Sequence, residues 1–275
     1  MHKKLEIESD VDEKSFLREL IGCYVMGYDV IEITSRKRIS PEIKKVVHEF
    51  TRRVIGPEII EEGSESMIIQ DVADHADLAM KKIVRRMHLM ARNMISEALD
   101  AVRTGEIELA NDVIERDDEI DRLHWFVEKQ HAMIGRNPAF ALRMKTDLLE
   151  ANSMLAISKA LERIADHASR IAHAVEMLQS SRLSDDILKR LDALSKKAIS
   201  VLDKSMEALF SKNPGEANKC IEDASALRDE TNDFLELAMK QKGKTAVALA
   251  FIAESLERTG GYSADIAEVA INIAE

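Results

Sequence analysis

The amino-acid sequence predicts a mainly α fold, with two tandem three-helix bundles that follow a small α+β module. Proline and glycine are sparse, with four and ten copies in 275 residues. Because both residues interrupt helices, long uninterrupted helices are expected. After the first 70 residues the few interruptions fall at regular intervals, and two short strings recur in the same order in each half of the remaining chain.

Residues 1–70 change character repeatedly, which is typical of short strands mixed with helices. Alternating or apolar runs predict strands at 29–34, 58–62 and 67–69. One helix is predicted over residues 13–25, and a second from Ser40 to about Val54, with Ser40 as N-cap and Pro41 in the first helical position. We therefore expect a small α+β module over residues 1–70.

Six long helices are predicted for the remainder of the chain. The interruptions that separate them are Gly105, Gly135 with Pro138, Ser180-Ser181, Pro214-Gly215 and Gly243. The resulting segments of about 25 to 40 residues suit a long bundle. Ser184 is expected to cap the fourth helix, with Asp185 and Asp186 in its first turn, where the helix dipole favours negative charge.

The six helices contain a weak internal repeat. Residues 110–115 resemble residues 217–222, and residues 160–163 resemble residues 255–258. Repetition in the same order indicates a duplicated three-helix unit. We expect the first repeat over residues 71–181 and a degenerate second repeat over residues 182–275, with a shorter connection between its second and third helices.

The charge and the cysteines narrow the function classes. The formal net charge of -11 disfavours nucleic-acid binding. A basic stretch could dock an anionic partner, although a solvated helix face is the more common explanation; it comprises Arg36, Lys37, Arg38, Lys44, Lys45, Arg52 and Arg53. Cys23 and Cys220 are interpreted as buried thiols. With no spanning segment or secretion signal, a cytoplasmic protein is expected.

Two pairs of carboxylates are the candidate functional residues. Asp117 and Asp121 lie on the second predicted helix, and Glu162 and Asp166 on the third, each pair four residues apart. Such a spacing places both carboxylates on one helix face, where their repulsion is slightly unfavourable and a bound cation would reverse it. Hard oxygen ligands of this kind suit iron, manganese, magnesium or calcium.

The same pattern allows an interpretation without metal. The carboxylates could belong to an interhelical salt-bridge network with Arg116, Arg163 and Arg170, and spacing alone does not choose between the two. His124 and His167 could add ligands, but histidines beside a buried helix face are more often held by hydrogen bonds.

The strings Asp-Asp-Glu-Ile-Asp at 117–121 and Leu-Glu-Arg-Ile-Ala-Asp-His at 161–167 resemble the paired acidic signatures of PhoU phosphate-uptake regulators. The resemblance spans residues 71–275 and implies that family's two three-helix repeats. Residues 22–29 and 55–62 are similar to the N-terminal region of archaeal-type members. Some of those carry an upstream DNA-binding module, which this chain is expected to lack.

The resemblance implies a regulator of phosphate uptake and phosphate homeostasis. Asp117, Asp121, Glu162 and Asp166 would be metal ligands, with iron expected first and then zinc, manganese or magnesium. The implied partners are the ATPase subunit of a phosphate ABC transporter and a sensor kinase, with membrane contact only through the transporter. A homodimer is expected, although seven Phe, three Tyr and one Trp provide few aromatic anchors.

The second repeat departs from the pattern. Ala224, Arg228 and Gly261 stand where acidic residues would be expected, and only Glu257 matches. Asp229 and Asp233, with Asp265, could form a displaced site, but one metal site in the first repeat is favoured.

Two rival functions remain. A di-iron carboxylate enzyme is suggested by residues 128–131, Glu-Lys-Gln-His, but that design needs two Glu-x-x-His elements and the sequence has one. A metal-free helical scaffold is the other. We expect no catalytic and no cofactor-binding residues.

Overall fold

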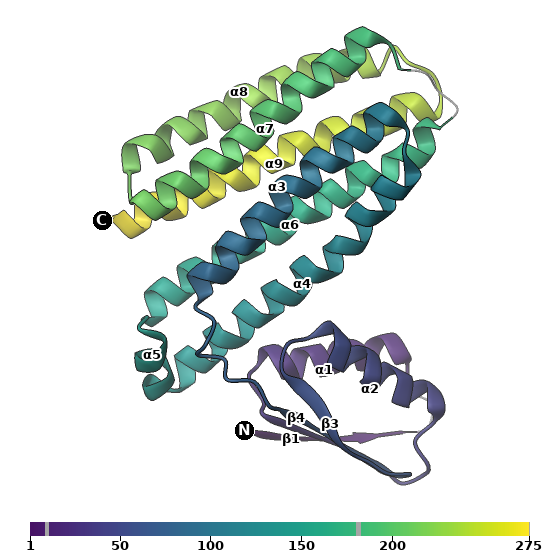
Figure 1. The fold of residues 1–275 in the computed structure, drawn as a ribbon, viewed down its shortest axis with the longest axis vertical. Helices are drawn as coiled ribbons and strands as arrows, with labels where there is room; N and C mark the ends of the chain where they lie inside the picture. Colours follow the sequence, from purple (N-terminus) through teal and green to yellow (C-terminus); the bar gives the residue numbers. More distant parts are fainter. Residues whose placement is uncertain (9–10, 180–182, 275) are drawn as a thin grey trace. The chain divides into compact units, whose positions relative to one another are not determined.

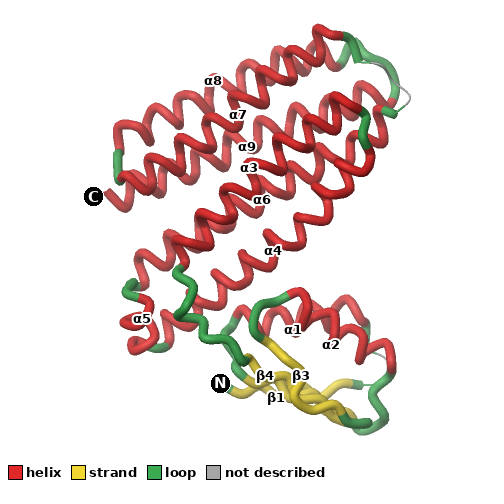
Figure 2. The backbone as a smooth tube through the Cα atoms, viewed as in Figure 1, coloured by secondary structure: helices red, strands yellow, loops and turns green. Residues whose placement is uncertain are grey.

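The computed structural model describes residues 1–8, 11–179 and 183–274. These residues form two compact units, one of residues 1–83 with 121–155, the other of residues 84–120 with those from 156 onward. The predicted fold class is confirmed, since long helices follow a small sheet with its own helices (Figures 1 and 2). The predicted break at Ser180-Ser181 and the boundary between 181 and 182 lie outside the described residues, and the division into 1–70, 71–181 and 182–275 stays a prediction.

Within the described part of the chain, the strands all lie in the first 71 residues. They are β1 (His2–Ile7), β2 (Val30–Ser35), β3 (Pro57–Glu62) and β4 (Ser66–Asp71). The helices among them are α1 (Glu13–Val25) and α2 (Pro41–Arg53). The later helices are α3 (Met80–Thr104), α4 (Ile107–Arg136), α5 (Pro138–Met144), α6 (Leu148–Leu178), α7 (Asp185–Ser211), α8 (Pro214–Ala238) and α9 (Lys244–Ala274).

The sheet has the strand order β1-β2-β4-β3. β1 and β2 are parallel and are joined through α1, whereas β4 is antiparallel to both β2 and β3. The buried side chains of β2 and β4 alternate with less buried ones; they are Ile31 and Ile33 in β2 and Met67 and Ile69 in β4. This period of two defines one apolar face, and α1 and α2 cover one face of the sheet (Figure 1).

The predicted starts of two helices are confirmed at atomic level. The Ser40 hydroxyl accepts a hydrogen bond from the Ile43 amide at 3.3 Å, and the Ser184 hydroxyl accepts one from the Ile187 amide at 3.4 Å. Each serine satisfies one amide that the first turn would otherwise leave without a partner. The helix predicted over residues 13–25 has the same bounds in the structure.

Two elements were not predicted. The sequence predicts no strand over residues 2–7. This segment nevertheless forms β1, which pairs along its whole length with β2. The short helix α5 lies where Gly135 and Pro138 predicted only a break. Asn137 caps α5 and Pro138 is its first residue, a normal helix start.

The internal repeat is visible in the helices. Ala110 is the fourth residue of α4 and Ala217 the fourth of α8, and both are buried. The connection from α8 to α9 is shorter than that from α4 to α6, as predicted, because the latter contains α5.

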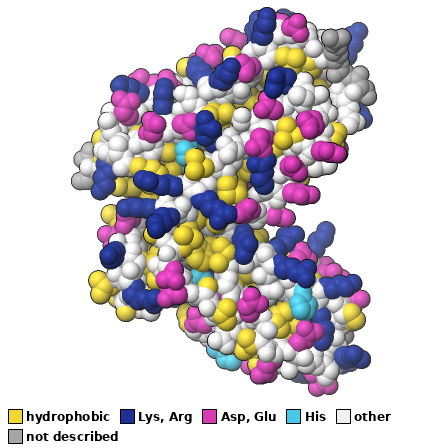
Figure 3. All heavy atoms as spheres, in the orientation of Figure 1, with side chains coloured by type: hydrophobic (Ala, Val, Ile, Leu, Met, Phe, Trp, Pro, Cys, Tyr) yellow, Lys and Arg dark blue, Asp and Glu magenta, His cyan; other side chains and the backbone are white. Residues whose placement is uncertain are grey.

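Within the unit that contains residues 84–120 and those from 156 onward, ion pairs tie neighbouring helices. Arg86 pairs with Glu119 and Arg116 with Glu97, joining α3 to α4. α7, α8 and α9 contact one another. On the face drawn in Figure 3, acidic and basic side chains are interspersed over α7 and α8.

The remaining sequence predictions can be compared directly. Cys23 and Cys220 are buried free thiols, and burial raises the pKa of Cys220 to about 11. In the basic stretch, three side chains have acidic partners: Arg36 with Glu6, Lys44 with Glu62 and Arg53 with Glu49. Among the described residues, no helix is both long and apolar enough to cross a membrane.

Candidate metal centre

The four predicted ligands lie on two long helices. Asp117 and Asp121 are on α4, and Glu162 and Asp166 are on α6. Asp117, Glu162 and Asp166 belong to one compact unit, and Asp121 is the first α4 residue of the other unit. All four are partly or fully shielded from solvent, whereas the neighbouring Asp118 is exposed. The prediction that these carboxylates lie at the edge of the buried helix faces is therefore confirmed.

Glu162 is the most shielded of the four, with 9% of the residue exposed. Its Oε1 accepts a hydrogen bond from Lys159 Nζ at 2.9 Å, and its Oε2 lies 3.6 Å from Arg163 Nε. Oε2 is buried and accepts no hydrogen bond from the described residues. A buried carboxylate oxygen that accepts no hydrogen bond raises the free energy of the folded state. A cation bound to this oxygen would lower that free energy.

Asp166 lies one turn further along α6, and its carboxylate is 3.4 Å from the Arg163 guanidinium. Burial raises the pKa of Asp166, and the Glu162 carboxylate raises it further, whereas Arg163 and Lys159 act in the opposite direction. The charge of Glu162 therefore disfavours the charged form of Asp166, and the charges of Arg163 and Lys159 favour it. A bound metal ion would favour the charged form of both carboxylates.

The surroundings on α6 are small and buried. Ser158, Ala165, Ser169 and Ala172 flank the pair of carboxylates, and each is nearly or fully buried. These neighbours match the prediction that small side chains surround the acidic pair.

The salt-bridge interpretation is borne out only in part. Arg163 pairs with Glu162 and Asp166, but these contacts lie within one helix rather than between helices. Arg116 pairs with Glu97, and Arg170 pairs with Glu254 at 2.9 Å while its guanidinium lies 4.6 Å from the Phe251 ring centre. Two of the three arginines, Arg116 and Arg170, thus pair with carboxylates other than the four candidates.

The two candidate histidines are held by other contacts. His167 Nδ1 lies 3.3 Å from the Ser255 hydroxyl, and its ring packs against Tyr262. Burial lowers the pKa of His167, and Arg170 lowers it further, so the neutral ring is favoured. His124 is buried and lies 3.6 Å from Glu128 on the same helix. The His167 contact fits the simpler prediction that a hydrogen bond holds this histidine, whereas 3.6 Å between His124 and Glu128 is too long for a hydrogen bond.

The second repeat provides a weaker acidic set. Asp229 and Asp233 are exposed on α8, and the Asp229 side chain is 75% exposed. Exposed carboxylates are well solvated by water and need no cation. Burial therefore gives no support to the displaced site.

No ready-made metal cluster is present in the described part of the chain, because no three His, Cys, Asp or Glu side chains are grouped to hold one ion. In this structure Lys159 and Arg163 occupy the positions of counterions to Glu162 and Asp166. The chemistry of the donors still suits a hard cation. The four-residue ligand set stays a prediction.

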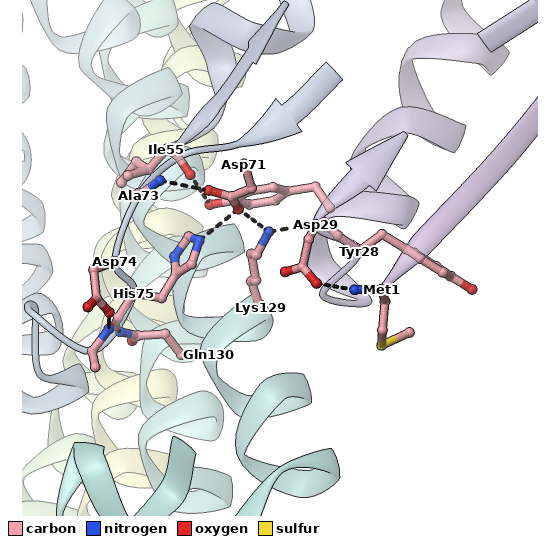
Figure 4. A network of polar contacts seen from close by, with 12 residues as sticks. Met1, Tyr28, Asp29, Ile55, Asp71, Ala73, Asp74, His75, Lys129 and Gln130 are labelled. Atoms are coloured by element: carbon pink, nitrogen blue, oxygen red, sulfur yellow. Dashed lines mark hydrogen bonds and ion pairs between the residues drawn. The ribbon is translucent and has the colours of Figure 1, made fainter. Parts of the chain in front are cut away.

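One polar cluster was missed by sequence reasoning. Within the unit that contains residues 1–83, Asp71 at the end of β4 accepts hydrogen bonds from Lys129 on α4 and from His75 Nε2, the latter at 2.7 Å (Figure 4). Lys129 is fully buried, and its ammonium lies 4.5 Å from the Tyr24 ring centre. Burial alone would raise the pKa of Asp71, but the bonds from His75 and Lys129 hold it below its ordinary value.

The same cluster extends along α4. The Gln130 amide donates to the carbonyl oxygens of His75 and Leu78, each at 2.7 Å (Figure 4). The Tyr24 hydroxyl donates to the Ile55 carbonyl at 3.0 Å. This buried cluster fastens the end of the sheet to α4. Lys129 and Gln130 are the middle residues of the string that suggested a di-iron enzyme, and His131 contacts Asn152 at 2.5 Å.

These helices define a class of protein: a mainly α array of long helices after a small sheet, with shielded carboxylates on α4 and α6. The model of the PhoU domain matches residues 84–175 and again residues 191–270. The chain belongs to the PhoU domain family. The two matched segments fall on α3–α6 and on α7–α9, and residues 1–83 precede the first.

Relatives and solved structures agree with this assignment. The chain is 26% identical to a phosphate-specific transport system accessory protein PhoU homolog of Zymomonas mobilis, covering 69% of this chain and 81% of the relative. It is also 26% identical to the homolog of Clostridium acetobutylicum, with 68% and 86% covered. Crystal structures of PhoU from Streptococcus pneumoniae and Pseudomonas aeruginosa each superpose with a TM-score of 0.61, at 18% and 19% identity. They cover 70% of this chain and 92% and 94% of theirs, and they show the fold.

Proposed function

We propose that the protein is an accessory regulator of a phosphate transport system, which it controls according to phosphate supply. The observation that carries this proposal is the match of the PhoU domain to two separate segments of six long helices. The relatives that are similar over most of their length are named as accessory proteins of phosphate-specific transport.

The regulator acts by protein contact and not by catalysis. Its partners are the ATPase subunit of the transporter and a sensor kinase, and it meets the membrane only through the transporter, from the cytoplasmic side. Two copies form a homodimer, and nucleic acid is not a partner. The names of the relatives support an accessory role, and the excess of acidic residues supports the exclusion of nucleic acid.

A metal ion is part of the proposed site. Asp117, Asp121, Glu162 and Asp166 would hold it, with iron first and zinc, manganese or magnesium as alternatives. Such an ion would supply positive charge to oxygens that are shielded from water, and it would hold α4 and α6 together. The buried Glu162 Oε2 and the raised pKa of Asp166 support this role.

Phosphate uptake tests the proposal. In the source cell, deletion of the gene should change the uptake of labelled phosphate and remove its response to phosphate starvation. Wild type should restore the response, and Asp117→Asn/Glu162→Gln should restore it poorly. Asp229→Asn/Asp233→Asn is the matched control, because it removes an exposed pair with the same spacing. Unchanged uptake in the deletion strain would contradict the proposed function.

The metal-free scaffold has one observation in its favour. Lys159 and Arg163 already neutralise Glu162 and Asp166 in part. If Asp117→Asn/Glu162→Gln restored uptake as well as wild type did, the regulator would work as a scaffold without metal.

A further inference from the structure

Two cations on α6 each have two possible partners. Lys159 and Arg163 lie four residues apart, so they share a helix face. Lys159 Nζ donates to Glu162 at 2.9 Å, and the Arg163 guanidinium lies 3.4 Å from the Asp166 carboxylate. The same two side chains also line a cavity that α6 forms with α9.

The cavity has a volume of about 330 Å³, within the size range of small-molecule pockets. Its walls are mostly apolar, with Ile157 from α6 and Tyr262, Ile266 and Val269 from α9. Lys159 and Arg163 are its cationic residues, and Asp265 is its acidic one. Both α6 and α9 belong here to the same compact unit.

The two cations are free to exchange partners. The Lys159 side chain is 45% exposed and that of Arg163 is 50% exposed, so neither is locked by packing. When a metal ion or an uncharged substitute takes the place of the carboxylate charges, the attraction that holds both cations toward Glu162 and Asp166 is lost. Their charges then face the cavity, where Asp265 alone opposes them among its lining residues.

We propose that the mouth of the α6/α9 cavity binds a phosphate-type anion, held by Lys159 and Arg163 once Glu162 and Asp166 no longer engage these two cations. Metal at the proposed site is the natural trigger, so in this respect the inference rests on the proposed function. Anion and metal then support each other's binding, because the coupling between two sites is reciprocal.

The chemistry of the two cations selects the ligand. A guanidinium offers two parallel donors that match the oxygens of a phosphate, and a lysine adds a point charge. The ligand is either free inorganic phosphate or a phosphate group on an organic body. The apolar walls and Tyr262 would contact such a body.

Calorimetric titration with inorganic phosphate and with phenyl phosphate tests the site in full-length protein. The key variant is Glu162→Gln/Asp166→Asn without metal, which releases both cations by substitution. It should bind at least one of the two probes about tenfold more tightly than metal-free wild type, the effect of about one charge-assisted hydrogen bond. The tighter-binding probe identifies the source of the phosphate group.

Two further variants complete the test. Adding Lys159→Gln/Arg163→Gln to the released variant should abolish the gain. In wild type with Mn²⁺, Asp265→Asn should strengthen anion binding, because it removes the opposing charge. Circular dichroism would show whether Glu162→Gln/Asp166→Asn folds. If it does not fold, Asp265→Asn still tests the anion site.

The possible failures can be told apart. If the folded Glu162→Gln/Asp166→Asn protein bound neither probe more tightly than wild type, the anion site would be wrong even if wild type held metal. If wild type took up no metal while the released variant bound the anion, the metal site would fail and the anion site would stand. For a variant that does not fold, no gain from Asp265→Asn in Mn²⁺-loaded wild type would overturn the site.

Discussion

At the scale of single residues, the protonation of Asp166 affects the stability of the metal-free protein. Burial and the charge of Glu162 raise its pKa, so the fold favours its protonated form. Its contribution to stability is therefore complete below the ordinary value of 3.8 and is lost as the pH rises through the raised value. At neutral pH the metal-free protein has to carry an unfavourable charge at this position.

Replacing Asp166 by Asn should thus stabilise the metal-free protein at pH 7. Because the Asp166 side chain is 40% exposed, solvent screens the effect, and a rise of about 1–3 °C in Tm is expected. The difference from wild type should shrink as the pH approaches 4. Differential scanning fluorimetry measures both, with Asp229→Asn as the exposed control.

Metal should reverse this order. Saturating Mn²⁺ stabilises whichever protein binds it in the folded state, so wild type should gain more than Asp166→Asn does. If the variant were less stable than wild type without metal, the carboxylate would serve the fold rather than a ligand.

Sequence reasoning located the four carboxylates because spacing on a helix fixes which side chains share a face. It could not show that Lys159 and Arg163 act as their counterions. Long flexible side chains choose among several acidic neighbours, and this choice depends on burial. The sequence of α6 itself contains both cations, Lys159 three positions before Glu162 and Arg163 three positions before Asp166.

At the scale of elements, α4 carries two separate sets of polar residues along its length. Asp117 and Asp121 lie in its first half, and Lys129 and Gln130 follow two to three turns later. In the unit of residues 1–83 with 121–155, the second half of α4 is fastened to the sheet by the buried cluster around Asp71 (Figure 4).

Removing Lys129 should loosen the sheet. Lys129→Met leaves the Asp71 charge buried without its ammonium partner, which should cost about 3–5 kcal/mol. Hydrogen–deuterium exchange should show faster exchange in β1, β2 and β4. Lys129→Met/Asp71→Asn should recover part of the loss, because neither charge then remains, and the exposed Lys82→Met is the control. Equal exchange in Lys129→Met and wild type would show that the cluster does not fasten the sheet.

The elements that sequence reasoning found are those with local signals. Ser40 and Ser184 predict the starts of their helices, and the alternation of apolar side chains predicts β2. β1 was missed because its pairing with β2 is set by residues almost 30 positions away. The Asp71–Lys129 pair was missed for the same reason, since 58 positions separate its members.

At the scale of the whole molecule, the PhoU domain matches two segments of the chain, and these segments differ in their acidic residues. The two copies keep their buried positions, such as Ala110 and Ala217, because packing needs them. At the positions that match the four carboxylates, the second copy has Ala224, Arg228 and Gly261, and only Glu257 is acidic. Its own pair at Asp229 and Asp233 is exposed. Both copies thus keep the long helices, whereas the set of four acidic residues is complete only in the first copy.

The family could be inferred from two acidic strings and the repeat, because both are patterns along the chain. The partner, the metal and the sensed signal could not be inferred in this way, because they depend on how the folded surface binds other molecules. The metal is the part of the account that a single measurement can decide.

That measurement is elemental analysis by mass spectrometry of protein purified without chelators. Wild type should carry iron or another transition metal at about one ion or more per chain, and Asp229→Asn/Asp233→Asn should carry the same amount. Asp117→Asn/Glu162→Gln should carry little or none. Equal, negligible metal in wild type and in Asp117→Asn/Glu162→Gln would contradict the metal site.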